Sequence, residues 1–404
     1  MHIGIVGYGT AGQAAALLLT RDGHAVEVFE RAPVLGPVGA GFLLQPTGLQ
    51  VLWSMGLLDD VLAHGARVDR LFGETPSGRP VMDMRYRELD ARLFGVGLQR
   101  GALFALLDAA WHDSRHIHCG ATIKHVDAET GLLRDAAGGS HGPFDLVLVA
   151  DGAHSSLRAS VSTPRLDAPY PWGAQWCLLE RVDWPWVHEL RQRYVGARRM
   201  IGMLPVGTRP GDDVERMSFF WSVQTSTFDP PHAVCEQAWR SQVEAVWPDV
   251  ARLLRDTCVH TGLAQARYRD TVASEWRRGR AVLIGDAAHA MSPQLGQGVN
   301  MALMDADALA RALRTHASLA DALSAYQRER SAHVGIYHFW SRWLTPVFQS
   351  EGDTVAWLRD RAMHPLSRLP GGRGQMLRVL TGTQHGWSGT LRLDPAFLDA
   401  LATR

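Results

Sequence analysis

The chain of 404 residues has no net charge and few cysteines. Lys+Arg and Asp+Glu both number 41, so no net electric field would attract nucleic acid or an anionic membrane. The cysteines, Cys119, Cys177, Cys235 and Cys258, lie far apart, with neither metal-binding spacing nor the density of a disulfide framework. These absences predict no nucleic-acid partner and no metal site. They favour small-molecule chemistry in a reducing cytoplasm.

The chain also lacks an apolar run long enough to cross a membrane. An apolar patch from Tyr337 to Phe348 is too short and carries Arg342. The first residues fit a strand, and they lack the charged and apolar regions of an export signal. With 46% hydrophobic and 20% charged residues, the composition is that of a globular protein. We therefore expect a cytoplasmic protein of about two domains without a membrane span.

The first thirty residues carry the strongest local pattern. An apolar strand over residues 2–6 precedes the turn "GYGTAG", a helix follows, and a second strand over residues 25–29 ends at Glu30. In such a βαβ unit Gly7 permits the tight turn, Gly9 lets the backbone approach a pyrophosphate, and Gly12 lets helix and strand pack. Glu30 can accept a hydrogen bond from a ribose hydroxyl. The pattern predicts dinucleotide binding and leaves FAD and NAD open.

Two later strands also end at an acidic residue. The segment "FDLVLVA" runs into Asp151, and the apolar run over residues 281–284 stops at Gly285 and Asp286. The carboxyl ends of parallel strands are where open α/β sheets bind ligands. The glycines in residues 296–298 lead into a helix N-terminus, which favours electron-rich ligand atoms. Each segment alone is equally consistent with ordinary turns, but together they predict one sheet edge around an extended dinucleotide.

Three motifs together resemble the single-component flavoprotein aromatic hydroxylases, typified by para-hydroxybenzoate hydroxylase and the salicylate and 3-hydroxybenzoate hydroxylases. "GYGTAG" with Glu30 is similar to the family's adenosine and pyrophosphate site, "ADGAHSSLR" to its Asp-Gly motif, and "GDAAHAMSPQLGQGVNMALMDADALA" to its ribityl-binding motif. The stretch "GAGFLLQPTGLQVLWSMGLLD" and the pair Arg100 and Leu103 also match. The resemblance covers roughly residues 1–330, and it is weaker at Thr47, where many members carry Asn.

The resemblance implies an FAD site with assigned roles. Asp286 would accept a hydrogen bond from a ribityl hydroxyl, and the backbone after Gly296 would face the pyrimidine carbonyl of the flavin. Pro293, over the flavin edge where oxygen adds, is implied in catalysis together with Gly296 and Gln45. His289 is usually structural in the family. The implied cofactor-binding residues are Gly7, Gly9, Gly12, Glu30, Arg31, Arg100, Asp151, Asp286, Gly298, Val299 and Asn300.

The predicted fold class is α/β: a Rossmann-like FAD-binding domain, a mainly antiparallel-sheet substrate domain and C-terminal helices. The substrate pocket is predicted to include Leu43, Trp176, Phe220 and Trp221, although aromatic core packing explains each tryptophan and phenylalanine alone equally well. The expected division assigns residues 1–70, 91–164 and 271–330 to FAD binding, 71–90 to a sheet excursion, 165–270 to the substrate domain and 331–404 to the C-terminal helical region.

The resemblance implies a monooxygenase that uses FAD, O2 and either NADH or NADPH to hydroxylate a small phenolic or heteroaromatic substrate through a flavin C4a-hydroperoxide. A monomer or homodimer is expected. A flavin-dependent reductase or oxidase without oxygen insertion is an alternative. A halogenase is another, but Trp184-Pro185-Trp186 does not continue as W-x-W-x-I-P, and the single lysine, Lys124, falls in the FAD-binding part. A non-catalytic dinucleotide sensor would not need the later motifs.

Overall fold

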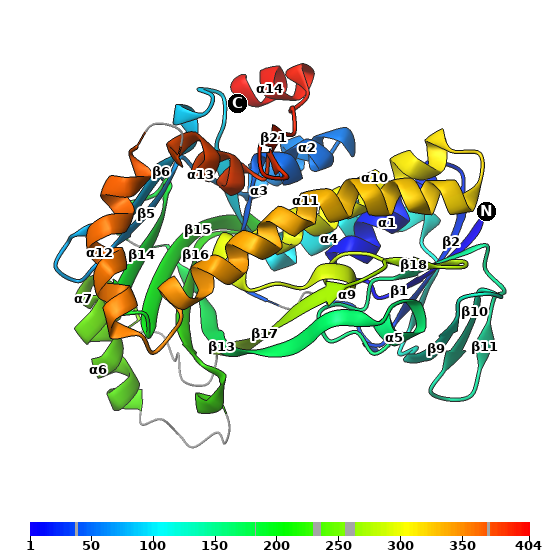
Figure 1. Ribbon diagram of the computed structural model, residues 1–404, viewed down its shortest axis with the longest axis horizontal. Helices are drawn as coiled ribbons and strands as arrows, with labels where there is room; N and C mark the ends of the chain where they lie inside the picture. Colours follow the sequence, from blue (N-terminus) through cyan, green and yellow to red (C-terminus); the bar gives the residue numbers. More distant parts are fainter. Residues whose placement is uncertain (37–38, 182, 229–235, 255–262, 370–371) are drawn as a thin grey trace.

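The computed structural model describes residues 1–36, 39–181, 183–228, 236–254, 263–369 and 372–404 (Figure 1). Among them, a six-stranded sheet has the order β18-β19-β12-β1-β2-β8. All its strand pairs are parallel except β18–β19. Strands distant in sequence therefore share one sheet, as the motifs predict. The strands are β1 (His2–Val6), β2 (Ala25–Glu30), β8 (Ile117–Cys119), β12 (Leu146–Val149), β18 (Arg277–Arg278) and β19 (Ala281–Leu283).

Helices rich in alanine pack closely against this sheet. α1 (Thr10–Arg21) lies beside α10 (Gly298–Thr315), and α11 (Leu319–Phe348) runs along α10 (Figure 1). The close approach depends on small residues: a Cβ added at Gly285 would lie 3.0 Å from the Cβ of Ala11 and 3.7 Å from that of Ala302. The Ser318 side chain caps α11 by accepting a hydrogen bond from the Asp321 N–H at 3.1 Å.

A second sheet of seven strands among the described residues has the order β17-β13-β16-β15-β14-β5-β6. Only the β14–β5 pair is parallel, so the expected mainly antiparallel sheet is confirmed. Its strands are β5 (Arg70–Glu74), β6 (Pro80–Arg85), β13 (Pro164–Glu180), β14 (Glu189–Val195), β15 (Arg199–Arg209), β16 (Asp212–Gln224) and β17 (Ala264–Ala273).

The two faces of this second sheet have different neighbours. One face is buried under α6 (Glu236–Val246) and α7 (Pro248–Leu253) in a cluster that includes Trp239 and Trp247. The other face contacts β3 (Gly41–Leu44), because a Cβ at Gly41 would lie 2.5 Å from the Val206 side chain and 2.9 Å from that of Ser218. Since side chains alternate along a strand, neighbouring residues of β15 and β16 belong to different faces.

The C-terminal helices return to the first half of the chain. α12 (Asp353–Ser367) and α13 (Gly372–Thr381) contact β6 at the left of Figure 1, and α14 (Pro395–Ala402) lies near the C-terminus. No helix in the described ranges is both long and apolar enough to cross a lipid bilayer. Further elements of the described residues are α2 (Pro46–Ser54), α4 (Arg100–Trp111), α5 (Arg158–Val161), α9 (Asp286–His289), β7 (Gly95–Gln99), β9 (Ile123–Asp127) and the 3-10 helices η1 (Tyr86–Glu88) and η4 (Pro293–Leu295).

Candidate active site

The GYGTAG turn joins β1 to α1 in a conformation that depends on glycine. Gly7 has φ +104°, and a Cβ there would lie 2.5 Å from the Ala150 carbonyl oxygen. A Cβ at Gly12 would collide with the carbonyl oxygen of Gly7, whereas one at Gly9 would meet nothing within 4 Å. The turn is therefore closed toward the protein and open above Gly9, which is what the approach of a pyrophosphate requires.

Glu30 closes this turn from the neighbouring strand. One carboxylate oxygen accepts a hydrogen bond from the Tyr8 N–H at 2.8 Å, and the other accepts one from the Ala32 N–H at 2.9 Å. The carboxylate is half-buried at the carboxyl end of β2. It is thus fixed beside the glycine turn, as expected for a group that contacts a ribose. Arg31, the next residue, is exposed.

Asp286 is an exposed carboxylate in a buried segment. Residues 281–290 are buried except for Asp286, which begins α9 after Gly285, whose φ is +59°. A Cβ at Gly298 would lie 3.9 Å from the Asp286 Oδ1 atom, so the carboxylate faces the N-terminus of α10. An acceptor beside bare backbone N–H groups fits the hydroxyl-bearing ribityl chain of FAD.

Asp151 follows β12 at the same sheet edge. One of its carboxylate oxygens accepts a hydrogen bond from the Ser156 N–H at 3.1 Å. The other oxygen is buried and has no hydrogen-bond partner in the described structure. Burial raises the pKa of Asp151, although hydrogen bonds to its carboxylate act in the opposite direction. A buried acceptor without a partner at the expected ligand edge is a second observation that fits FAD.

A buried network of charged side chains contacts the residues on either side of Asp286. The sequence motifs did not predict this network. The Asp305 carboxylate, completely buried on α10, accepts hydrogen bonds from the Gly285 N–H at 2.8 Å, His289 Nε2 at 2.6 Å and Arg330 Nε at 2.7 Å. Burial alone would raise the pKa of Asp305, but the charges and hydrogen bonds of His289 and Arg330 lower it to about 2. His289 therefore has a structural environment, as the family resemblance implies.

The same network continues into the C-terminal segment. Arg330 Nη1 donates to His333 Nδ1 at 2.7 Å, and His333 Nε2 donates to the Gly382 carbonyl oxygen at 2.9 Å. Burial and the charge of Arg330 lower the pKa of His333 to about 3, so this imidazole is neutral at physiological pH. We name Gly285, His289, Asp305, Arg330 and His333 the Asp305 network. One sequence signal could have found it, because Asp305 lies within the apolar stripe of α10.

Arg158, at the start of α5, joins two of the motifs. Its side chain is 2% exposed, and Nε donates to the Ala287 carbonyl oxygen at 2.7 Å. Nη1 donates to Asp167 at 3.0 Å, and Nη2 donates to the Ala153 carbonyl oxygen at 3.0 Å. Arg158 bonds both to the loop after Asp151 and to α9. It therefore fixes the carboxyl end of β12, which leads to Asp151, relative to that of β19, which leads to Asp286.

Gln45 and Asn300 join β3 to α10. Asn300 is completely buried; its Oδ1 accepts from the Gln45 N–H at 2.9 Å, and its Nδ2 donates to the Leu43 carbonyl oxygen at 3.2 Å. The Gln45 side chain accepts from the Tyr86 hydroxyl at 2.7 Å. Thr47, where many family members carry Asn, donates to the Thr381 carbonyl oxygen at 3.3 Å. These contacts fix the backbone of β3 relative to Gly298 and Val299 at the start of α10.

The loop before α10 contains Pro293 and Gly296. Pro293 begins η4, and Gly296 ends it with φ +62°, a conformation that favours glycine. Gln294 Nε2 donates to Gln349 Oε1 at 2.5 Å, and Gln349 Nε2 donates to Ser222 Oγ at 2.7 Å. We name Ser222, Gln294 and Gln349 the Gln349 network. It connects the loop to β16 and to the residue that follows α11.

The predicted substrate-pocket residues are not all brought together. Trp176 and Phe220 are cross-strand partners and therefore share a face of the second sheet. Trp221 points to the opposite face, where it is buried with Phe219 and Trp239. The prediction that Trp221 lines the same pocket is wrong, because adjacent residues of β16 point to opposite faces. Leu43 is buried on β3.

Arg100 begins α4, close to the predicted flavin side. Its guanidinium carbon lies 5.7 Å from the centre of the Phe42 ring, and its side chain packs so tightly on Gly39 that a Cβ there would collide with it. Arg100 as a whole is exposed. This leaves its charge available to an anionic or polar cofactor group.

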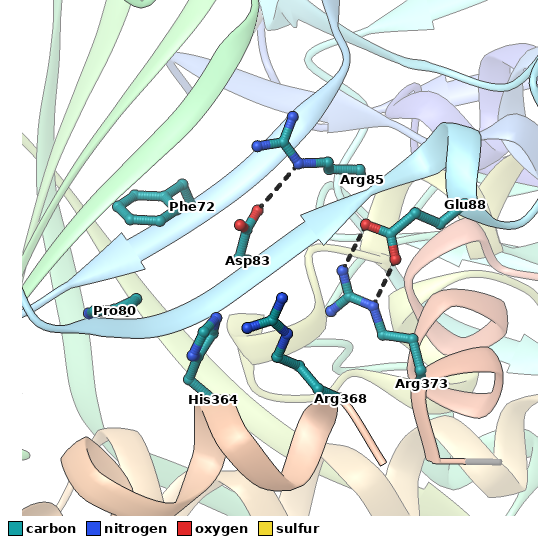
Figure 2. A pocket seen from close by; sticks show the side chains of 8 residues that line it. All are labelled: Phe72, Pro80, Asp83, Arg85, Glu88, His364, Arg368 and Arg373. Carbon is teal, nitrogen blue, oxygen red and sulfur yellow. Dashed lines mark hydrogen bonds and ion pairs between the residues drawn. The ribbon is translucent and has the colours of Figure 1, made fainter. Parts of the chain in front are cut away.

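A cavity of ≈ 510 Å³ lies elsewhere, between β5, β6, η1, α12 and α13 (Figure 2). Its carboxylates are already paired: Glu88 with Arg373 at 2.7 Å, and Asp83 with Arg70 at 2.6 Å. None of the residues predicted to bind FAD or substrate lines it. The full lining is Phe72, Pro80, Asp83, Arg85, Glu88, His364, Arg368 and Arg373.

Comparisons with known proteins agree with this geometry. Residues 1–336 match the family model described as an FAD binding domain. The aurachin C monooxygenase/isomerase of Stigmatella aurantiaca is 28% identical over 373 residues, covering 90% of this chain and 94% of that protein. The 2-heptyl-3-hydroxy-4(1H)-quinolone synthase of Pseudomonas aeruginosa strain UCBPP-PA14 is 30% identical over 374 residues, covering 89% of this chain and 93% of that protein.

A solved structure has the same fold. Klebsiella pneumoniae HpxO, crystallised with FAD and uric acid, superposes with a TM-score of 0.78 at 21% identity, covering 94% of this chain and 96% of that one. The family model and the relatives confirm the resemblance seen in the motifs, and the predicted Rossmann-like fold is confirmed with it. The chain belongs to the family of FAD-dependent aromatic monooxygenases and is a flavoprotein monooxygenase of small aromatic substrates.

Proposed function

We propose that this monooxygenase hydroxylates a neutral heteroaromatic ring, such as a 4-quinolone, and consumes O2 and NADH or NADPH. The observation that carries the proposal is the neutral character of the groups around Pro293. In the part of the chain that the structure describes, the side chains of Gln294, Gln349 and Ser292 hydrogen-bond only to neutral partners. A substrate carboxylate held by these three side chains would lack the cation that usually compensates such a charge.

A second set of neutral groups lies beside the same loop. Ser292 shares a hydrogen bond with the Ser341 hydroxyl at 2.6 Å. The buried Tyr170 hydroxyl lies close enough to Ser292, Gln294 and Thr345 to interact with them, and burial raises its pKa. An un-ionised phenol can donate to a ring carbonyl, and amide or hydroxyl oxygens can accept from a ring N–H. These groups therefore match a quinolone better than a benzoate.

We assign FAD to the edge formed by the glycine turn, Asp151 and Asp286. FAD bound there would supply the activation of oxygen. The protein binds and orients: Glu30 and the glycine turn hold the adenosine half, and Asp286 holds the ribityl chain. The N-terminus of α10 presents N–H dipoles toward developing negative charge. The residues proposed to hold FAD are Gly7, Gly9, Gly12, Glu30, Arg31, Arg100, Asp151, Asp286, Gly298 and Val299; Asn300 and Gln45 are proposed to act through the backbone that they fix.

The remaining proposals concern organisation. We keep the sequence-based division, with residues 165–270 and the excursion 71–90 forming the substrate domain and residues 331–404 the C-terminal region. Pro293 and Gly296 are proposed to lie against the flavin edge, and Leu43, Trp176 and Phe220 to contact the substrate. A cytoplasmic monomer or homodimer is the expected form.

The test is a substrate panel on the FAD-loaded enzyme. NADH and NADPH consumption would be followed with neutral 4-quinolones, with indoles, and with salicylate and other phenolic acids, while product mass is recorded under ¹⁸O2. We expect a quinolone product heavier by one labelled oxygen and faster turnover than with any phenolic acid. Turnover restricted to phenolic acids would refute the substrate class. Consumption without ¹⁸O in the product would favour the reductase or oxidase alternative.

A further inference from the structure

A cluster of histidines surrounds one carboxylate on the FAD-binding sheet, away from the proposed active site. Donor atoms of Glu27, His116 and His118 all lie within 4.8 Å of one another. Glu27 comes from β2, and the two histidines come from the edge strand β8 and the residue before it. Glu27 is half-buried, His118 is half-buried and His116 is exposed, so the cluster is open to solvent on one side.

Strand geometry explains why these side chains converge. His116 and His118 are two residues apart, and alternation along a strand points both to the same face. The Val28 N–H donates to the His116 carbonyl oxygen at 2.9 Å, and Phe29 is the ladder partner of His118. Glu27, two residues before Phe29, therefore shares the face that both histidines occupy.

Two further contacts hold the ligand groups in place. The Phe29 ring stacks on His118 at 4.7 Å with an interplanar angle of 8°, which restricts the imidazole to one orientation. One oxygen of Glu27 lies 2.8 Å from His2 Nε2, and the other lies 3.0 Å from His118 Nε2. Metal-binding side chains in proteins are typically oriented by such neighbours.

We propose that Glu27, His116 and His118 form a binding site for a divalent transition metal that prefers imidazole, with Zn²⁺ as the most suitable probe. Two imidazoles and one carboxylate are ligands that zinc accepts, with solvent at the fourth position. Bonds of about 2.0–2.1 Å place tetrahedral donors about 3.4 Å apart, so the 3.0 Å Glu27–His118 contact must open slightly, and any wider donor separation in the cluster, at most 4.8 Å, must close to this spacing. Cysteine spacing, on which the prediction of no metal site rests, gives no signal for a site made of one glutamate and two histidines.

The role that follows is structural. A metal bound by both strands would connect β8, the edge of the sheet, to β2 more firmly than backbone hydrogen bonds alone. β2 ends at Glu30, three residues after Glu27, and Glu30 pairs with Cys119 of β8. The metal would therefore support the strand that presents the proposed ribose-binding carboxylate, without contact with substrate.

The experiment uses the FAD-loaded chain without a histidine tag, freed of metal by chelation. Zn²⁺ would be titrated calorimetrically, with Mg²⁺ as the hard-cation control, and Tm would be measured with each. We expect one Zn²⁺ per chain, a higher Tm with Zn²⁺ and neither effect with Mg²⁺. His118→Ala should abolish the binding. His2→Ala, which removes only a neighbour of Glu27, should weaken it by about tenfold to a hundredfold.

Two further variants keep the test decisive. Glu27→Gln retains a hydrogen-bonding side chain if His118→Ala does not fold, and it should also lose Zn²⁺ binding. His125→Ala removes an exposed histidine on β9, outside the cluster, and should bind as the wild type does. Absence of one-to-one Zn²⁺ binding in the wild type overturns the proposal, as does binding that survives in both His118→Ala and Glu27→Gln.

Discussion

The Asp305 network and the Gln349 network both connect the flavin-side loops to α11 and its C-terminal end, but one is charged and the other is neutral. The Asp305 side chain is completely buried, and its two carboxylate oxygens accept from Gly285, His289 and Arg330. In the Gln349 network the groups are neutral: the Gln294 amide donates to the Gln349 amide oxygen at 2.5 Å, and the Gln349 amide donates to the Ser222 hydroxyl at 2.7 Å. Neutral donors and acceptors can exchange partners at low cost, whereas a buried charge cannot.

This difference separates a fixed part of the site from an adaptable one. The Asp305 network sets the position of Gly285, and through it the exposed Asp286 carboxylate, irrespective of what is bound. The Gln349 network holds the Pro293 loop with bonds of the kind that a neutral substrate could replace. Substitutions in the Asp305 network should therefore change stability and FAD binding. Substitutions in the Gln349 network should mainly change the fraction of consumed NAD(P)H that is lost as hydrogen peroxide.

The largest effect is expected for Asp305→Ala. The substitution leaves Arg330 buried without its partner, so the free energy of unfolding should fall by about 3–5 kcal/mol. Arg311→Ala is the matched control on the same helix, since Arg311 is half exposed and pairs with Asp307 and Glu329. That change should cost at most about 1 kcal/mol in urea unfolding. Equal costs for the two variants would refute the distinction between buried and exposed pairs.

Asp286→Ala should come next and should leave the fold intact. The exposed carboxylate contributes little to packing, but a charge-assisted hydrogen bond to the ribityl chain is worth about 1.5–3 kcal/mol. We expect a folded protein with weaker FAD binding, measured by flavin fluorescence. Asp286→Asn keeps an acceptor and should lose less affinity than the alanine variant. Unchanged FAD affinity in Asp286→Ala would remove this residue from the proposed site.

The stability of the protein should depend on pH through His333, a buried member of the Asp305 network. Burial, aided by Arg330, lowers the pKa of His333 from 6.5 to about 3. Between these values the unfolded chain binds a proton that the folded protein does not, so this contribution to stability is complete above pH 6.5 and declines as pH falls. The slope is at most about 1.4 kcal/mol per pH unit.

The check is urea unfolding between pH 5 and 7 on the wild type and on His333→Gln. The variant should show a smaller fall in stability with decreasing pH, because glutamine does not titrate. His125→Gln, at an exposed position, should keep the wild-type slope. A slope unchanged by His333→Gln would mean that this imidazole does not titrate as its surroundings indicate.

Gln349→Leu should lower stability far less than Asp305→Ala. Loss of neutral hydrogen bonds to Ser222 and Gln294 should cost about 1 kcal/mol. The less constrained Pro293 loop should admit water, so a larger fraction of consumed NAD(P)H should appear as hydrogen peroxide. Gln224→Leu, which breaks an exposed bond to Glu351 at 2.9 Å, is the control. Equal peroxide yields in the two variants would mean that the Gln349 network does not affect how NAD(P)H consumption is coupled to hydroxylation.

Local sequence patterns were sufficient for the cofactor half of the molecule. The glycine turn, the acid-tipped strands and the helix after Gly298 are each short contiguous segments whose geometry depends on neighbours in sequence. The structure places Gly7, Glu30, Asp151 and Asp286 at one sheet edge, as the motifs predict. The error at Trp221 arose because the adjacent residues Phe220 and Trp221 were assigned to one pocket, although alternation along a strand places them on opposite faces.

The sequence by itself determined the family, the Rossmann-like fold and the residues proposed to hold FAD, because those features follow from backbone conformations that glycine and strand ends encode locally. Only the tertiary structure decided which charges and histidines come together. Asp305 and Arg330 are 25 residues apart, and Glu27 and His118 are 91 apart. Such contacts depend on the packing of α10 against α11 and the pairing of β2 with β8, which no single segment specifies.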